Sequence, residues 1–144
     1  MSSFEKFRSN YEQAIYVVLN PQLNLHVGVF NPSLQVFLKE KNTQQWAMIT
    51  AYNPGSTICT ASKNRFMNGQ LEQLLHKERF RFHEAEHRDP KGLWPVENSF
   101  FIENIELERA LALGRKFGQN GIVAGDQEAI PLLFDCTFRE TTGD

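Results

Sequence analysis

The order of strand-like and helix-like segments is the feature of this sequence that most limits its fold. Between residues 47 and 124, apolar spacing typical of strands and of helices alternates in the order β-α-β-β-α-β. That order is the split arrangement of ferredoxin-like folds. Together with a preceding α-β-β-α extension, it predicts an α+β fold with a mixed sheet.

The individual elements follow from local periodicity and capping residues. The predicted helices span residues 3–13, 32–41, 61–77 and 106–117, and their predicted N-caps are Ser3, Asn31, Thr60 and Asn104. The predicted strands span residues 15–19, 24–30, 46–52, 80–86, 99–102, 121–124 and 131–134. A long polar loop is expected at residues 87–98.

Length and composition exclude several classes of protein. A chain of 144 residues can bury one core, so we expect a single domain over residues 1–136 and a flexible tail at 137–144. The net charge of -2, with both signs interspersed, offers no basic face for nucleic acid. No apolar run approaches the roughly 18 residues of a membrane span. Cys59 and Cys136 lack metal or disulfide spacing, and a cytoplasmic location is expected.

Chain direction predicts that several polar loops meet at one end of the sheet. A helix runs back antiparallel to the strands it connects, and a hairpin reverses the chain. The turn at residues 53–56 and the loop at 87–98 would then lie beside the turn at 117–120 and the corner at 31–33. Helices beginning near residues 32 and 60 would also direct unpaired N–H groups toward this end.

The Asn-Pro-Gly-Ser turn is suited to a small polar or anionic ligand. A Pro-Gly corner after a strand can expose Asn53 and Ser56 beside a helix N-terminus, a geometry that binds carboxylates and phosphates. Arg65 in the next helix can hold an anion in a fork. Asn64 and Asn68 lie one turn apart on that helix.

Further polar and aromatic residues are expected around this turn: Arg88, Asp89, Trp94, Glu97, Gln119 and Asn120. The indole of Trp94 offers a flat surface for stacking. The predicted ligand edge is therefore formed by residues 53–56, 64–68, 88–97 and 117–120.

Each of these features also has a purely structural interpretation. Asn, Pro, Gly and Ser all favour turns for backbone reasons, and Gly118 is typical of a helix end. Arg65 can pair with Asp89 or Glu97 instead of an anion, and Trp94 can anchor its loop by packing. A protein-interaction or regulatory module would use the same edge to dock a partner.

Four motifs resemble a bacterial family of proteins of unknown function, the domain of unknown function numbered 3293. They are ITAYNPGS, NRFMNGQL, RDPKGLWPVENS and RKFGQNGIV, which stand in the order and spacing of the family over approximately residues 47 to 134. The resemblance implies motif positions at Asn53, Pro54, Asn64, Arg65, Asp89, Trp94, Pro95, Glu97, Ser99, Phe117, Gly118, Gln119 and Asn120. It implies no activity, and His87 stands outside the family pattern.

The segment HEAEH, residues 83–87, formally matches the zinc-hydrolase pattern H-E-x-x-H. That pattern needs a helix, because it places the two histidines one turn apart. Period-two alternation predicts a strand here, in which His83 and His87 would be about 13 Å apart. A zinc hydrolase using His83, Glu84 and His87 is therefore the third hypothesis, behind the ligand-binding domain and the interaction module. We expect no metal site, and no motif indicates a cofactor.

Overall fold

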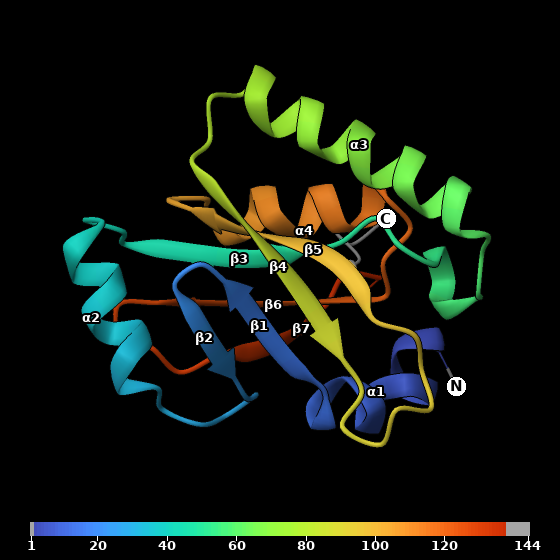
Figure 1. Ribbon diagram of the computed structural model, residues 1–144, viewed down its shortest axis with the longest axis horizontal. Helices are drawn as coiled ribbons and strands as arrows, with labels where there is room; N and C mark the ends of the chain where they lie inside the picture. The colour runs from blue at the N-terminus through green and yellow to red at the C-terminus, as the bar shows by residue number, and fades with distance from the viewer. Residues whose placement is uncertain (1, 138–144) are drawn as a thin grey trace, which may run out of the picture.

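The computed structural model describes residues 2–137 and has an α+β architecture (Figure 1). Within this range, seven strands form one curled sheet, accompanied by α-helices and a short 3-10 helix, η1. The elements in chain order are α1 (Ser3–Gln13), β1 (Ile15–Leu19), β2 (Gln22–Leu25), α2 (Pro32–Glu40), β3 (Gln45–Ile49), η1 (Pro54–Ser56), α3 (Ala61–Lys77), β4 (Phe82–Arg88), β5 (Glu97–Glu103), α4 (Leu107–Lys116), β6 (Gly121–Asp126) and β7 (Leu132–Asp135). Of the tail predicted at 137–144, residues 138–144 lie outside the described residues.

All neighbouring strands pair antiparallel, in the order β2-β1-β4-β5-β3-β6-β7. The prediction of a mixed sheet is therefore wrong. β3 and β4 run in the same direction, but β5 lies between them, and β3 likewise separates β5 from β6. The connections through α3 and α4 each skip one strand position and the connection through α2 skips three, so strands of the same direction never become neighbours.

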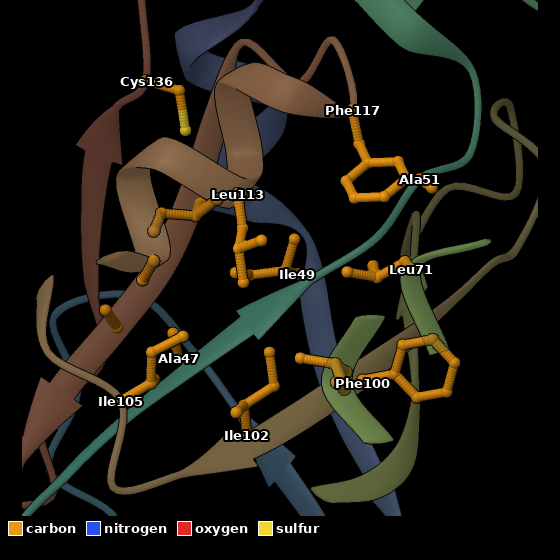
Figure 2. Close-up of a cluster of buried hydrophobic side chains, with 14 residues drawn as sticks. Ala47, Ile49, Ala51, Leu71, Phe100, Ile102, Ile105, Leu113, Phe117 and Cys136 are labelled. Atoms are coloured by element: carbon orange, nitrogen blue, oxygen red, sulfur yellow. The ribbon is translucent and has the colours of Figure 1, made fainter. Parts of the chain in front are cut away.

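Alternate residues of the central strand β3 face two hydrophobic clusters on opposite sides of the sheet. Ala47 and Ile49 belong to the outer cluster, where α3 contributes Leu71 and α4 contributes Leu113 (Figure 2). Cys136 also lies in this cluster, and burial raises the pKa of its thiol to about 12. The outer face of the sheet is thus covered by α3 and α4.

The inner cluster lies on the other face, which the curled sheet partly encloses. Trp46 and Met48 of β3 pack there with residues of α2, including Leu34. The two edges of the sheet approach each other, since the Gly28 N–H after β2 donates to the Pro131 carbonyl before β7 at 2.7 Å. The inner face is therefore a trough, and α2 packs against it.

The corner at residues 31–33 does not join the other polar loops, so that part of the predicted convergence is wrong. The Asn31 N–H donates to the Ala129 carbonyl at 3.0 Å. Ala129 follows β6, whose last residue Asp126 pairs with Gln45 at the beginning of β3. The corner consequently lies at the end of the sheet where β3 begins, away from the turn that follows β3.

Several helix boundaries are confirmed and others are corrected by hydrogen bonding. Thr60 and Asn31 accept from Lys63 N–H and Leu34 N–H, as expected of N-caps. Ser2, rather than Ser3, caps α1. The prediction of Asn104 as a cap is wrong, because its side chain accepts from Gln44 N–H while α4 begins after Glu106.

Several strand boundaries also differ from prediction, including the end of β3 at Ile49 instead of residue 52. β2 ends at Leu25 instead of residue 30, because Gly28 adopts a left-handed φ of 79° in a turn. β4 extends to Arg88 and β5 begins at Glu97, so the polar loop is confined to residues 89–96.

Among the helices of residues 2–137, none combines the length and apolarity that crossing a membrane requires.

A glycine pair provides a test of the packing between α4 and the C-terminal segment. A Cβ atom at Gly114 would lie 2.5 Å from Cys136 Sγ, whereas one at Gly69 of α3 would meet nothing within 4 Å. We expect Gly114→Ala to lower the free energy of unfolding by about 1–3 kcal/mol through overpacking. Gly69→Ala should raise it by about 0.5–1 kcal/mol through helix propensity. Urea denaturation of both variants measures this, and equal effects would contradict the packing.

Candidate functional site

A cavity of about 270 Å³ opens at the end of the sheet where β3 and β4 end. Its walls come from α1, the 89–96 loop and the strands β6 and β7, and its floor from the inner face of the sheet. Seven of the predicted site residues line it: Asn53, Ser56, Asp89, Trp94, Glu97, Gln119 and Asn120. Asn64, Arg65, Asn68 and Arg88 do not.

The predicted convergence of three polar loops is confirmed by direct hydrogen bonds. The Gly55 N–H donates to the Gly118 carbonyl at 2.7 Å, which joins the turn after β3 to the end of α4. Asn53 Nδ2 donates to Glu97 Oε2 at 2.7 Å, which joins the same turn to the beginning of β5. Gln119 Nε2 donates to the Tyr52 carbonyl at 3.1 Å. These loops therefore form one continuous wall.

Asn53 holds the corner after β3 in a left-handed conformation, with φ at 47°. Asparagine tolerates this region better than most residues because its side chain can hydrogen-bond to nearby backbone. Asn64 of α3 secures it, since Asn64 Oδ1 accepts from Asn53 N–H at 2.8 Å and Asn64 Nδ2 donates to Asn53 Oδ1 at 2.9 Å. Asn53 Oδ1 also accepts from Cys59 N–H.

Asn68 has a comparable structural role. Its Oδ1 accepts from Ala51 N–H at 3.1 Å, one turn of helix further along α3. Both Asn64 and Asn68 are buried. The two amides therefore tie α3 to the end of the central strand, and neither side chain lines the cavity.

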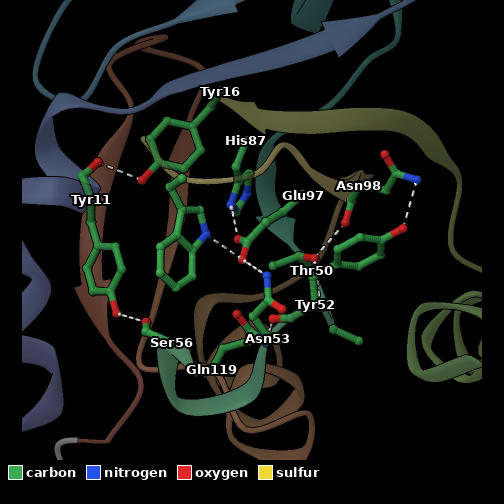
Figure 3. A network of polar contacts seen from close by, with 12 residues as sticks. Tyr11, Tyr16, Thr50, Tyr52, Asn53, Ser56, His87, Glu97, Asn98 and Gln119 are labelled. Atoms are coloured by element: carbon green, nitrogen blue, oxygen red, sulfur yellow. Dashed lines mark hydrogen bonds and ion pairs between the residues drawn. The ribbon is translucent and has the colours of Figure 1, made fainter. Parts of the chain in front are cut away.

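Glu97 occupies the centre of the site and connects three segments of chain (Figure 3). Its Oε2 accepts from Asn53 Nδ2 at 2.7 Å and from Trp94 Nε1 at 3.0 Å, and its Oε1 lies 3.7 Å from His87 Nδ1. Burial would raise the pKa of this carboxyl, but the contact and charge of His87 and the donors Asn53 and Trp94 outweigh it. The pKa of Glu97 is held below its ordinary value, so the carboxylate is ionised at neutral pH.

His87 faces the same cavity from β4. Its ring packs edge-on against Tyr16, with centroids 4.7 Å apart. His87 Nε2 is buried and has no hydrogen-bond partner among residues 2–137. Burial, as the largest influence, raises the pKa of Tyr16, whose hydroxyl donates to the Tyr11 carbonyl at 2.6 Å. Tyr16 is thus a neutral donor that fixes the end of α1.

A second polar group lies on the opposite side of the cavity. The Tyr11 hydroxyl and Ser56 Oγ are 2.6 Å apart, and Asn120 Nδ2 donates to both at 3.1 Å and 3.3 Å. Tyr11 therefore attaches α1 to two of the predicted loops. Sequence reasoning did not assign α1 to the site. The aromatic spacing of Phe7 and Tyr11 was a usable signal, because it marks the face that this helix buries.

Asp89 organises the loop that carries Trp94. Its carboxylate accepts from the backbone N–H groups of Lys91, Leu93 and Trp94, each at 3.0 Å. These bonds, led by that of Lys91, lower the pKa of Asp89. Arg88 turns away from the cavity and pairs with Glu86 at 2.7 Å. The carboxylate of Asp89 thus serves the loop itself.

Arg65 lies in a separate groove of about 460 Å³ between α3 and β4. Glu72, Glu84 and Glu86 line the same groove. Arg65 is exposed and forms no ion pair or hydrogen bond within the described part of the chain. It pairs with neither Asp89 nor Glu97, because α3 presents it on the outer face of the sheet.

The strand predicted for the HEAEH segment is confirmed, since these residues lie within β4. His83 Nε2 contacts Glu103 Oε2 at 2.6 Å, while His87 lies beside Glu97. Over residues 2–137, no three His, Cys, Asp or Glu side chains are grouped as metal ligands. The helical geometry on which the zinc hypothesis depends is therefore absent from this segment.

The segment that supplies most of this site matches a known family. The model of the family described as "Protein of unknown function (DUF3293)" matches residues 49–122, just over half of the chain. The chain belongs to this family. No curated protein and no solved structure matches it significantly.

The DUF3293 match includes all four segments of the predicted ligand edge, but it omits α1, β1 and β7. Phe7, Tyr11 and Leu133 line the cavity from these omitted elements. The matched segment therefore contributes most of the residues that line the cavity, and elements on either side of it in the chain complete the lining.

Glu97→Gln tests whether the ionised carboxylate stabilises this arrangement. We expect the free energy of unfolding at pH 7 to fall by about 1–3 kcal/mol, because charge-assisted hydrogen bonds become neutral. The pKa of Glu97 is depressed in the folded state, so its contribution is present above the ordinary value of 4.5 and is lost as pH falls through the folded-state pKa.

The difference in unfolding free energy between wild type and Glu97→Gln should accordingly shrink as pH falls below 4.5 and through the lowered folded-state pKa of Glu97. Glu40→Gln is the matched control, since Glu40 is exposed at the end of α2. It should change stability by less than about 0.5 kcal/mol at any pH. A pH-independent difference for Glu97→Gln would show that the charge has no stabilising role.

Proposed function

We propose that this protein binds a small polar molecule in the cavity between α1 and the 89–96 loop. The observation that carries the proposal is a concave, mixed polar and aromatic cavity that contains a buried, ionised carboxylate. Pockets of this kind, with few convergent polar groups on apolar walls, are the usual form of small-molecule sites. Trp94 and Tyr11 supply the aromatic surface, while Glu97, Gln119 and Asn120 supply polar atoms.

The proposal differs in one respect from the ligand edge predicted from sequence. That prediction assigned the positive potential of the site to two helix N-termini and to Arg65, which lines the other groove. The basic residues of the cavity are His87 and Lys91, and they stand beside the carboxylates of Asp89 and Glu97. A polar ligand remains the proposal, without dependence on Arg65.

A second candidate is the docking of a protein partner on the 89–96 loop. Leu93 is 82% exposed and Val96 is 49% exposed, although both are apolar. Trp94 is not part of an open patch, because its indole N–H points to Glu97. Val96→Ser, at a position that does not line the cavity, would remove partner binding but should leave occupancy of the cavity unchanged, which separates the two candidates.

We also propose that β3, α3, β4, β5, α4 and β6 constitute a ferredoxin-like core. The sheet order β4-β5-β3-β6 and the antiparallel pairing of these strands support it. The shared packing of α3 and α4 on the outer cluster also supports it. On this view the site lies on the face that α3 and α4 leave uncovered.

Ala14→Phe tests the ligand-binding proposal by filling the cavity without removing a polar group. Ala14 lines the cavity at the end of α1. A thermal-shift screen of nucleotides, sugar phosphates, carboxylates and amines should give stabilisation of wild type, about 2.7 kcal/mol at a hundredfold excess over Kd. Ala14→Phe should abolish that shift, and Arg65→Ala, outside the cavity, should retain it.

The indole N–H resonances provide an independent measurement in the same experiment. Trp94 lines the cavity, whereas Trp46 is 1% exposed in the inner cluster and serves as an internal reference. Ligand binding should shift the ¹H–¹⁵N signal of Trp94 and leave that of Trp46 in place. The proposal is wrong if no compound produces a thermal shift or a Trp94 signal shift in wild type that is lost in Ala14→Phe.

A further inference from the structure

The charges that line the cavity are unequally available to a ligand. Asp89 already accepts three backbone N–H groups of its own loop. Lys91 is exposed, at the outer part of that loop. Glu97 is different, because only 13% of its side chain is exposed and it lies at the base of the cavity. The site therefore contains a buried carboxylate, whose basic neighbour is the largely buried ring of His87.

The two oxygens of Glu97 are unequally satisfied. Oε2 accepts from both Asn53 and Trp94. Among residues 2–137, the polar contact of Oε1 is with His87 Nδ1, at 3.7 Å, which is longer than a hydrogen bond. A carboxylate oxygen can accept two hydrogen bonds. Oε1 can therefore accept from a donor group that a ligand brings into the cavity.

Aromatic side chains line the cavity that contains the Glu97 carboxylate. Phe7 and Tyr11 of α1, Tyr16 of β1 and Trp94 of the 89–96 loop all line the cavity. The faces of aromatic rings attract cations through their quadrupole, and the attraction is largest where water is excluded. A carboxylate among aromatic rings is the combination that recognises an ammonium group.

We propose that the ligand of this site carries a protonated amine, which pairs with Glu97 Oε1 between the aromatic walls formed by Tyr11, Tyr16 and Trp94. This inference rests on the proposed ligand-binding function and deepens it by naming the class of ligand. The depressed pKa of Glu97 supports it, because the carboxylate is already charged before an amine arrives. The amide groups of Gln119 and Asn120 would bind a polar group elsewhere on the same molecule.

Matched fragments test the charge of the ligand with the wild-type protein alone. 2-Phenylethylamine, 2-phenylethanol and 3-phenylpropionate have similar rings and lengths but carry a cation, a neutral hydroxyl and an anion. Titration of each is followed through the Trp94 indole N–H resonance, with Trp46 as the reference. We expect the amine to bind at least tenfold more tightly than the alcohol and the acid, and a tenfold ratio corresponds to about 1.4 kcal/mol.

The outcomes separate this inference from the proposed function. If the alcohol or the acid shifts Trp94 at the same or lower concentration than the amine, the inference is wrong while the cavity remains a binding site. The same conclusion follows if no fragment binds but a non-amine from the wider screen does. If nothing binds at the cavity, both proposals fail.

Two substitutions then locate the amine. Glu97→Gln should reduce the preference for amine over alcohol to less than about threefold, because a neutral amide loses the charge-assisted hydrogen bond. Lys91→Gln removes the nearby positive charge at an exposed position and should raise amine affinity while lowering that of the acid. This second variant keeps the test decisive if Glu97→Gln does not fold, since weaker amine binding in Lys91→Gln would contradict the proposal.

Discussion

The hydrogen bonds to the buried carboxylate of Glu97 are the interactions on which the rest of the site depends. It stands at the first residue of β5 and receives donors from the turn after β3 and from the 89–96 loop, with His87 of β4 beside it. An ionised group can remain buried only if polar partners replace its hydration. Here those partners come from separate segments, so satisfying one charge fixes the relative positions of two loops and β4. The Asn53 corner is held from behind as well, by Asn64.

The two faces of the sheet divide structural and functional roles between them. On the outer face, α3 and α4 cover the sheet with an apolar cluster, and the groove beside Arg65 lies between α3 and β4. On the inner face, α2 packs at one end of the trough and α1 lies across the other, where the cavity remains. The hydroxyl of Tyr11 and the backbone carbonyl that accepts from Tyr16 attach α1 to this end. The position of α1 therefore determines the size of the cavity.

The residues at the DUF3293 motif positions have a common structural role. Asn53, Asn64, Asp89 and Glu97 all hydrogen-bond to one another or to the loop backbone. The main role of these residues is thus to hold the loops at the cavity in place. The groups that face a ligand, by contrast, include Tyr11, which lies outside the matched segment. The family motifs therefore contain the residues that hold the loops together, and elements outside the matched segment complete the cavity.

The sequence alone determined the α+β class, the bounds of α3, the strand at His83–His87 and the meeting of three polar loops, because these follow from local periodicity and from chain reversal. It could not determine which strands become neighbours, and the expected mixed sheet became antiparallel. Nor could it show that Arg65 lies on the outer face while Tyr11 lies at the cavity. Those positions depend on how α3 is rotated about its axis and on where α1 packs against the sheet. Pairing across the sheet and side-chain packing decide those facts, and they involve residues far apart in the chain.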